Sequence, residues 1–425
     1  MKFYLSTAAL TLLGGTGGEL SSTWLEAKDS RAALTQASGD GSTQGESAPI
    51  GSAGAGRMIS GLPGSVRDAL LDARLEEVLR SSGIPGAVGA IVQLGTATRV
   101  GVAGVRKAGN EAFMTADDLV HIGSDTKAMT AVLVARLVQQ GKLEWDSTIA
   151  GVLPSIADSI HPDFRDVTVA DLLRHVAGLP ANPANWSAFA GKDLRARRLR
   201  IAEEAMSSAP LSRPGKKHLY SNLSVMIAGA MAEAAADAAW EDLMRSEVFL
   251  PLGMEVADFG VPGTPGQTDQ PWGHRPLKDG SFAPVQLDND PALGPAGTVH
   301  LSMADWARFV TVFLEDAGSD GAQAFLSPES RKALLAPGPG GEYGMGWLLL
   351  ERGWAKGQAL SHSGSNTSWY ATAWVAPEID VAFLVAANAY GPDVSAQLDA
   401  FISQCVLGML AERASGNDRA DDSPR

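Results

Sequence analysis

One serine and one lysine in this chain have the spacing that places two side chains on the same face of a helix. Ser124 and Lys127 form the only Ser-x-x-Lys in the sequence. Residues three positions apart lie one helical turn from each other, so the lysine nitrogen can reach the serine oxygen. A lysine accepts a proton only when neutral, and both burial and the positive end of a helix dipole disfavour its ammonium form. The pair is a candidate nucleophile with its proton acceptor, although by itself such a serine can equally be a helix N-cap.

Asp125 lies between these two residues. It is about 100° around the same helix from the serine, because successive residues of a helix are rotated by that angle. We therefore expect Asp125 to interact favourably with the helix dipole rather than to act on the serine.

A second motif, Tyr220-Ser221-Asn222, is the only Tyr-x-Asn among the five tyrosines. It follows Pro214-Gly215 at the junction between a loop and an expected helix. A phenol can relay a proton between a serine and a leaving group, and a carboxamide can hold both a lysine amine and a substrate carbonyl. The alternative is that Ser221 or Asn222 only caps the helix.

A third motif, His362-Ser363-Gly364-Ser365, lies at the end of an expected strand. A glycine there would let a substrate approach the backbone, and the N–H groups of an exposed strand can donate to an oxyanion. A His-x-Gly sequence is weak by itself, so its weight depends on the other two motifs.

The elements around these motifs begin with a helix and a hairpin. Apolar residues at helical spacing predict a helix at residues 66–79. Two runs of β-branched and small residues, 87–93 and 97–103, predict a hairpin. An apolar run at 127–141 that ends at a glycine predicts the helix with Ser124 at its N-terminus.

The middle third of the chain is helical in pattern, and the last third changes to strands. Thr168-Val-Ala-Asp171 is typical of a capping box, and helices are predicted at 222–235 and 239–248. Strands are predicted at 343–350, 358–362, 368–376 and 381–387, followed by a helix at 394–410. We therefore expect an α/β fold of the α+β type, in which an antiparallel sheet built from both chain ends is flanked by helices, with a helical region inserted at about 141–295.

The ends of the chain differ in composition from its body. Residues 1–20 contain one lysine followed by an apolar stretch and are interpreted as a possible signal segment, with a mobile hydrophobic terminus as the alternative. Residues 21–60 are poor in large apolar side chains and predict a flexible linker, and residues 414–425 predict a polar tail. This leaves 61–413 as the catalytic domain. We expect export to the periplasm, the cell envelope or the medium, with the cytoplasm as the alternative, and no membrane-spanning helix in the mature chain.

Composition excludes several classes of function. A chain of 425 residues that is 45% hydrophobic and 19% charged is typical of a folded protein. A net charge of −14 without a long basic run argues against nucleic acid as a partner. With one cysteine, Cys405, and scattered histidines we expect no metal site and no cofactor. Side chains should therefore act on a small ester, amide or peptide, and the oligomeric state is left open.

In order and spacing, the three motifs resemble those of the β-lactamase-related serine hydrolases. This superfamily contains class C β-lactamases, D-Ala-D-Ala peptidases, D-amino-acid amidases and β-lactamase-like carboxylesterases. The resemblance runs from about residue 62 to residue 410 and implies a β-lactamase/transpeptidase-like fold with one catalytic unit. Accessory matches are Asp171-Leu-Leu-Arg-His-Val-Ala-Gly-Leu-Pro180, Phe249-Leu-Pro-Leu-Gly-Met254, Pro295-Ala-Gly-Thr298, Asp305 and Tyr343-Gly-Met-Gly-Trp347.

The resemblance also implies roles for the motif residues. Ser124 would be the nucleophile, Lys127 its activating partner, and Tyr220 the relay or general base that also serves water in deacylation. Asn222 would position Lys127 and substrate. The backbone N–H groups of Ser124 and Ser365 would form the oxyanion hole.

One motif departs from the β-lactamase pattern. His362-Ser363-Gly364 stands where many β-lactamases have Lys-Thr-Gly, so the fixed positive charge suited to a penicillin carboxylate is missing. We therefore favour a carboxylesterase-type hydrolase of small esters or amides that forms an acyl-enzyme. The alternatives are a β-lactamase, a D-Ala-D-Ala carboxypeptidase or D-aminopeptidase, and a non-catalytic homologue that binds peptides. An α/β-hydrolase is disfavoured because the chain has no Gly-x-Ser-x-Gly.

Overall fold

The computed structural model describes residues 64–191, 193–314, 325–339 and 341–421. The expected signal segment at 1–20 and linker at 21–60 lie outside the described residues. Their assignment stays a prediction.

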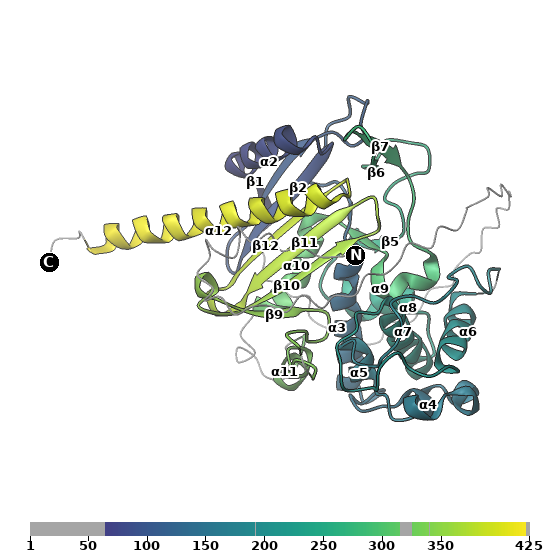
Figure 1. Ribbon diagram of the computed structural model, residues 1–425. Coiled ribbons are helices and arrows are strands. Elements are labelled where there is room, and N and C mark those ends of the chain that lie inside the picture. The colour runs from purple at the N-terminus through teal and green to yellow at the C-terminus, as the bar shows by residue number, and fades with distance from the viewer. Residues whose placement is uncertain (1–63, 192, 315–324, 340, 422–425) are drawn as a thin grey trace.

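A seven-stranded sheet built from both ends of the chain forms the frame of the molecule (Figure 1). Its strands are β1 (Ser65–Arg67), β2 (Gly86–Gln93), β3 (Thr98–Gly104), β9 (Leu348–Arg352), β10 (Gly357–Ser365), β11 (Tyr370–Ala376) and β12 (Val381–Ala387). They lie in the order β1-β3-β2-β12-β11-β10-β9. Strand β12 pairs antiparallel with β2, which confirms that the two chain ends share one sheet. The sheet is not purely antiparallel as expected, because β1 pairs parallel with β3 at one edge.

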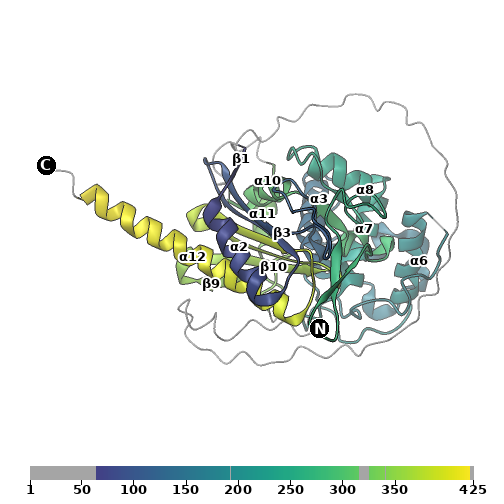
Figure 2. The same ribbon diagram turned by 90° about the horizontal axis from the view of Figure 1, so that it is seen from above.

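Each face of this sheet carries its own core. Successive side chains of a strand point to opposite faces, and on β12 Val381, Phe383 and Val385 join one apolar cluster while Ala382 and Leu384 join the other. Helices α2 (Ala69–Ser82) and α12 (Pro392–Asp421) lie side by side across the first face (Figures 1 and 2). Helix α10 (Met303–Leu314) covers the second face.

Two elements start later than the sequence predicts. Val66 and Arg67 belong to β1, and α2 begins only after Asp68, whose side chain accepts from the N–H groups of the first turn. A strand of three residues is too short to show its own periodicity, so Val66 was counted with the helix. Likewise the strand expected at 343–350 starts at Leu348, because the preceding residues turn against Ala128, with Gly346 at a φ of 87°.

The helical region lies between the two halves of the sheet in sequence. Its helices are α3 (Thr126–Gln139), α4 (Ile149–Val152), α5 (Val169–Leu173), α6 (Leu194–Met206), α7 (Asn222–Ala236), α8 (Trp240–Leu243), the π-helical turn η4 (Met244–Phe249) and α9 (Gly294–Gly297). The 3₁₀ turns are η1 (Gly123–Asp125), η2 (Pro154–Ser159), η3 (Pro162–Phe164), η5 (Pro291–Leu293), η6 (Gly353–Ala355) and η7 (Pro377–Ile379). Thr168 and Asp171 form the capping box that was predicted.

Small strands within and beside this region were not predicted. They are β4 (Val120–His121), β5 (Asp258–Phe259) and β8 (Val299–Leu301), which form one sheet, and β6 (Gly273–Pro276) and β7 (Phe282–Val285), which form another. The remaining helix, α11 (Pro328–Leu334), follows α10.

Helix α12 extends further than the sequence predicts. It runs to Asp421, into the expected polar tail, and its C-terminal part projects from the body (Figure 1). Within the described residues, its stretch Asp393–Ser415 has the length and hydropathy of a membrane-crossing helix. The bent pair of α7 with Trp240–Phe249 meets the same criterion if it is counted as one span. Leu398, Phe401 and Val406 of α12 are nevertheless buried in the core beside the sheet, so packing accounts for part of its apolar character.

His274 on β6 is buried with hydrogen bonds that require a neutral ring. Its Nδ1 lies 2.6 Å from the carbonyl oxygen of Asn388, and the N–H of Ala108 donates to its Nε2 at 2.9 Å. A carbonyl needs a donor and an N–H needs an acceptor, so the proton is on Nδ1. Burial lowers the pKa of His274 to about 4.

We expect this histidine to make stability depend on pH in mildly acidic solution. Its pKa is about 4 when folded and 6.5 in its ordinary state, so between these values the unfolded chain binds the extra proton. The free energy of unfolding should therefore fall as pH is lowered through this window. Urea unfolding at a series of pH values gives the free energy of unfolding as a function of pH for wild type and His274→Gln. The two plots should run parallel above pH 7.5, and below pH 6.5 the free energy of unfolding should fall less steeply for the variant. Equal slopes from pH 6.5 to 4.5 would contradict the assignment.

Candidate active site

Ser124 and Lys127 are in contact where α3 begins. Ser124 lies in η1, the 3₁₀ turn that leads directly into α3. Lys127 Nζ lies 2.9 Å from Ser124 Oγ and 2.6 Å from the carbonyl oxygen of Ala296. The structure thus brings together the two side chains whose spacing first indicated chemistry.

The environment of Lys127 disfavours its charged form. The residue is 1% exposed, and this burial lowers the pKa of Lys127 well below its ordinary value, with Asp125 opposing the shift. A neutral amine can donate one N–H to the Ala296 carbonyl and direct its lone pair at the Ser124 hydroxyl. The arrangement can therefore take a proton from the serine.

The carbonyl that holds Lys127 belongs to α9, which is tied to the rest of the molecule on two sides. On one side Thr130 of α3 donates its hydroxyl to the Pro295 carbonyl at 2.7 Å. On the other side η5, the turn before α9, is held by a buried guanidinium. Arg198 Nε donates to the carbonyl oxygen of Ala292 at 3.2 Å, and its Nη2 donates to that of Pro291 at 3.0 Å.

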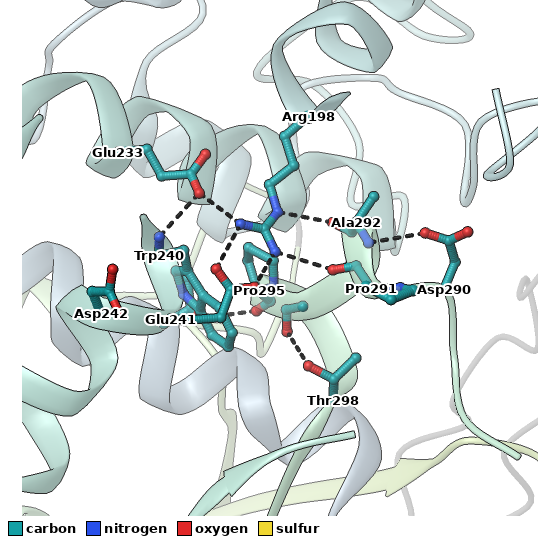
Figure 3. A network of polar contacts seen from close by, with 12 residues as sticks. Arg198, Glu233, Trp240, Glu241, Asp242, Asp290, Pro291, Ala292, Pro295 and Thr298 are labelled. Carbon is teal, nitrogen blue, oxygen red and sulfur yellow. Dashed lines mark hydrogen bonds and ion pairs between the residues drawn. The ribbon is translucent and has the colours of Figure 1, made fainter. Parts of the chain in front are cut away.

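Two carboxylates balance this guanidinium (Figure 3). Arg198 lies 2.6 Å from Glu233 of α7 and 2.5 Å from Glu241 of α8. Glu233 also accepts the backbone N–H of Trp240 at 3.0 Å. The network joins α6, α7 and α8 to η5 and so fixes where α9 presents its carbonyl to the lysine.

Tyr220 precedes α7 and faces the serine. Burial raises the pKa of the Tyr220 phenol, and a hydrogen bond with Ser124 acts against that rise. The Tyr220 ring packs on His175, with ring centroids 4.6 Å apart, and its centroid is 4.9 Å from Lys127 Nζ. The phenol is thus neutral at ordinary pH, and Tyr220 lies beside the contacting pair of serine and lysine.

Asn222 is placed differently from its expected position. Ser221 is the N-cap of α7 and accepts the N–H of Ser224, so Asn222 is left free of capping. Its Nδ2 donates to Asn182 Oδ1 at 2.9 Å, whereas the hydrogen bonds of Lys127 run to Ser124 and Ala296. A role of Asn222 in holding Lys127 finds no such contact among the described residues, and a role in binding substrate stays a prediction.

Two glycines bring the backbone of η1 against the end of β10. A Cβ on Gly364 would lie 1.9 Å from the Ile122 carbonyl oxygen and 2.5 Å from the Ser124 nitrogen. A Cβ on Gly123, whose φ is 51°, would lie 2.2 Å from the Ser365 nitrogen. Gly364 is therefore required for the close approach of these two backbone segments, and its expected role in substrate approach stays a prediction. The N–H groups expected to bind an oxyanion belong to these two segments.

His362 and Ser363, the other residues of this motif, have protein partners. His362 Nε2 lies 3.1 Å from the Tyr343 hydroxyl oxygen, and Ser363 Oγ donates to Thr372 Oγ1 at 3.0 Å. Burial, together with the charge of Lys127, lowers the pKa of His362 to about 3. The histidine is therefore neutral at physiological pH, and it stands in the site without a charge.

Asp125 is buried beside the site, on a face of the helix that β10 covers. It is 2% exposed, and its Oδ1 lies 4.0 Å from His362 Nδ1. Burial raises the pKa of Asp125 well above its ordinary value, although the charge of Lys127 lowers it. The angle around the helix correctly turned Asp125 away from Ser124, but what covers that face is β10 and not water. An acidic residue directly before an apolar helix was the available signal.

His175 also lies beside the site. Its ring lies among those of Tyr220, Tyr343 and His218, with centroid distances of 4.6, 4.9 and 5.6 Å. Burial lowers the pKa of His175 well below its ordinary value. This aromatic cluster packs against Tyr220, which hydrogen-bonds to Ser124.

A family model described as Beta-lactamase matches residues 71–418. The chain belongs to the β-lactamase family. This confirms the resemblance drawn from the three motifs and the β-lactamase/transpeptidase-like fold, and family members are serine hydrolases that form acyl-enzymes.

Curated relatives include penicillin-binding and hydrolytic proteins. The chain is 29% identical over 289 residues to Penicillin-binding protein 4 of Amycolatopsis lactamdurans, covering 65% of this chain and 71% of that protein. It is 26% identical over 236 residues to Unguisins hydrolase ungD' of Aspergillus campestris, covering 52% of this chain and 42% of that protein. An Escherichia coli (strain K12) protein named as a D-alanyl-D-alanine carboxypeptidase is 28% identical over 150 residues, covering 34% of this chain and 35% of that protein. The chain thus spans less than half of the latter two.

Solved structures support the same fold. SurE superposes with a TM-score of 0.66 at 24% identity, covering 79% of this chain and 74% of that one. The octameric penicillin-binding protein homologue from Pyrococcus abyssi gives 0.64 at 21% identity, covering 80% and 77%. At these identities the likeness shows the fold alone.

We expect Arg198→Leu to lower the free energy of unfolding by about 3–5 kcal/mol, the usual cost of leaving a buried charge without its partner. Glu233, the partner concerned, is 3% exposed. Urea unfolding should show that the double variant Arg198→Leu/Glu233→Leu recovers part of the loss. The matched control is Arg200→Leu on the same helix, whose side chain is 53% exposed and pairs with Glu203, and it should cost less than about 1 kcal/mol. A similar loss for both arginines would contradict the network's role.

Proposed function

We propose that this protein is a serine hydrolase that forms a covalent acyl-enzyme on Ser124. The observation that carries the proposal is the 2.9 Å contact between Lys127 Nζ and Ser124 Oγ in a place where burial disfavours the ammonium form. A serine is a weak nucleophile at its ordinary pKa and is activated by an adjacent base. A neutral Lys127 meets that need.

The reaction then proceeds in two halves. Ser124 Oγ attacks the substrate carbonyl carbon while its proton passes to Lys127, and the carbonyl oxygen becomes an oxyanion bound by the N–H groups of Ser124 and Ser365. The Tyr220 phenol gives its proton to the departing alcohol or amine and regains one from Lys127, so the carbon–leaving-group bond breaks and the ester to Ser124 remains. In the second half, water attacks the acyl carbon and gives its proton to Tyr220, which passes its own proton to Lys127. Lys127 then returns a proton to Ser124 Oγ as the ester bond breaks and the acid is released.

A homologue that binds peptides without turnover is the alternative from another class. Ser124, Lys127 and Tyr220 are all present. Ser124 and Lys127 are in contact, and the Tyr220 phenol hydrogen-bonds to Ser124. A site that had lost turnover would have no need of a buried lysine at this distance. These contacts favour an enzyme.

For substrate we propose small esters or amides without a carboxylate at the position of His362. This histidine is neutral, buried and bonded to Tyr343, so it offers no fixed charge to an anion. The activity is therefore of the carboxylesterase type.

A second candidate is cleavage of peptides that contain D-residues, including D-Ala-D-Ala carboxypeptidase or D-aminopeptidase activity, with β-lactam hydrolysis a further alternative. It is favoured by the relatives described as a penicillin-binding protein and a D-alanyl-D-alanine carboxypeptidase, and by a solved structure of SurE with D-Leu. Export, expected from residues 1–20, stays a prediction.

We expect an alkyl fluorophosphonate to add one adduct to the wild-type chain, at Ser124. Intact-mass and peptide-mass analysis would place it. Ser124→Ala should not be labelled, whereas the matched control Ser187→Ala, at an exposed serine, should react like wild type. Tyr220→Phe should turn over ester ~10²–10⁴-fold more slowly, as for loss of an acid–base group. Unchanged labelling of Ser124→Ala would refute the assignment of the nucleophile.

We expect the wild type to hydrolyse p-nitrophenyl butyrate with a higher kcat/KM than a chromogenic cephalosporin or a D-alanyl peptide. Because the pKa of His362 is about 3, this residue stays neutral from pH 8 to pH 5, and the ester-to-cephalosporin ratio should stay constant. A histidine with an ordinary pKa would charge in this range and shift the ratio toward the anionic cephalosporin. A cephalosporin that outpaces every ester would replace the esterase proposal by the β-lactamase alternative.

A further inference from the structure

Two adjacent side chains outside the three motifs reach each backbone segment on which the proposed mechanism depends. Asp288 and Asn289 lie just before η5. Their contacts run to β4, to the turn after β10 and to the end of α9. They link parts of the site that come from widely separated stretches of the chain.

The first contact leads to the segment ahead of the nucleophile. The N–H of Gly123 donates to His121 Nδ1 at 3.1 Å, which places the ring proton on Nε2. That Nε2 lies 2.8 Å from Asp288 Oδ1. His121 is fully buried and the Asp288 side chain is 9% exposed, so this contact is sheltered from water. Asp288 thereby fixes the peptide that immediately precedes Ser124.

The second contact leads to the turn after Ser365. Asn366 Nδ2 donates to the same Oδ1 of Asp288 at 3.1 Å. Asn366 Oδ1 in turn accepts the N–H groups of Ser368 and Trp369 at 3.2 and 3.1 Å and so shapes the turn. One carboxylate oxygen therefore contacts both segments that carry the expected oxyanion donors.

The third contact comes from the neighbouring residue. Asn289 Nδ2 donates to the carbonyl oxygen of Gly297 at 2.8 Å. Gly297 follows Ala296, whose carbonyl accepts from Lys127. The pair 288–289 is thus attached to the lysine's partner as well as to the two halves of the oxyanion hole.

We propose that Asp288 is a positioning residue for the oxyanion hole, in which its Oδ1 holds His121 and Asn366 and thereby sets the separation of the Ser124 and Ser365 N–H groups. This inference rests on the proposed acyl-enzyme function. Stabilisation by such donors is sensitive to position, because they must point to where the negative charge develops. A displaced donor weakens binding of the tetrahedral state more than binding of the substrate.

The test is a set of full-length variants assayed with p-nitrophenyl butyrate and with an alkyl boronic acid, whose tetrahedral adduct on serine places an oxygen in the hole. Asp288→Ala removes the shared acceptor and should lower kcat by about 10²-fold, as a lost or misplaced donor does. The boronate inhibition constant should rise by a similar factor while KM changes less than about threefold. Asp288→Asn keeps an oxygen at that place and should retain kcat within about tenfold of wild type.

Two further variants make the outcome decisive. Asp279→Ala alters an aspartate in a surface turn, where it accepts from Ser281, and should match wild type in kcat and boronate inhibition. His121→Phe keeps a ring but removes the link to Asp288; it should show the same kinetic profile, and combining it with Asp288→Ala should add little. Circular dichroism would confirm folding. If Asp288→Ala does not fold, the kcat and boronate inhibition constant of His121→Phe test the proposal instead, and wild-type values would overturn it.

Wild-type kcat and boronate inhibition in folded Asp288→Ala would overturn this inference while Ser124 labelling leaves the proposed function standing. A wild-type chain that neither turns over ester nor is labelled at Ser124 would overturn the proposed function, and this inference with it.

Discussion

A lysine amine kept dry beside a serine hydroxyl is the constraint on which the rest of the structure depends. An ammonium group in water is strongly hydrated, so a neutral amine near pH 7 requires burial on every side. Helix α3 meets this by burying all of its side chains from Thr126 to Ala135. Helix α7 follows directly on the tyrosine, α9 provides a carbonyl, and β10 closes the remaining side through its contact with η1. The helical region and the sheet are both needed, because the lysine lies at their junction.

Few of the ionisable groups near this lysine are charged at the same time. Burial raises the pKa of Asp125 and lowers the pKa of Lys127, so each favours its neutral form, while their mutual attraction favours the ionised pair. Burial likewise keeps the pKa of His362 low. The fixed charges nearby face other partners, with Arg198 between two glutamates and Asp288 beside His121. Such separation leaves the reacting groups free to exchange protons without first breaking an ion pair.

Features that depend on local spacing were predictable from the sequence, and features that depend on distant contacts were not. The Ser124–Lys127 pair follows from the pitch of one helix, and β12 was predicted at its observed residues because its apolar run is bounded by turns. The Ala296 carbonyl and Asp288 carry no such signal, since their relevance arises from which loops the fold brings together. Asp125 shows the limit within a helix: the angle was right, but periodicity does not say whether water or a strand lies opposite. The three-residue β1 was missed because a period needs several repeats.

The place of β12 in the sheet has a consequence for how the chain folds during translation. Gln93 pairs with Val381, which is synthesised 288 residues later. Until then one edge of β2 presents unpaired backbone groups in the middle of what will become the sheet, and such an edge can pair with other chains. Contacts this distant in sequence also make folding slow. The nascent hairpin therefore has to be shielded for most of translation, and Ser124 meets β10 only after Ser365, 241 residues further along the chain, has been synthesised.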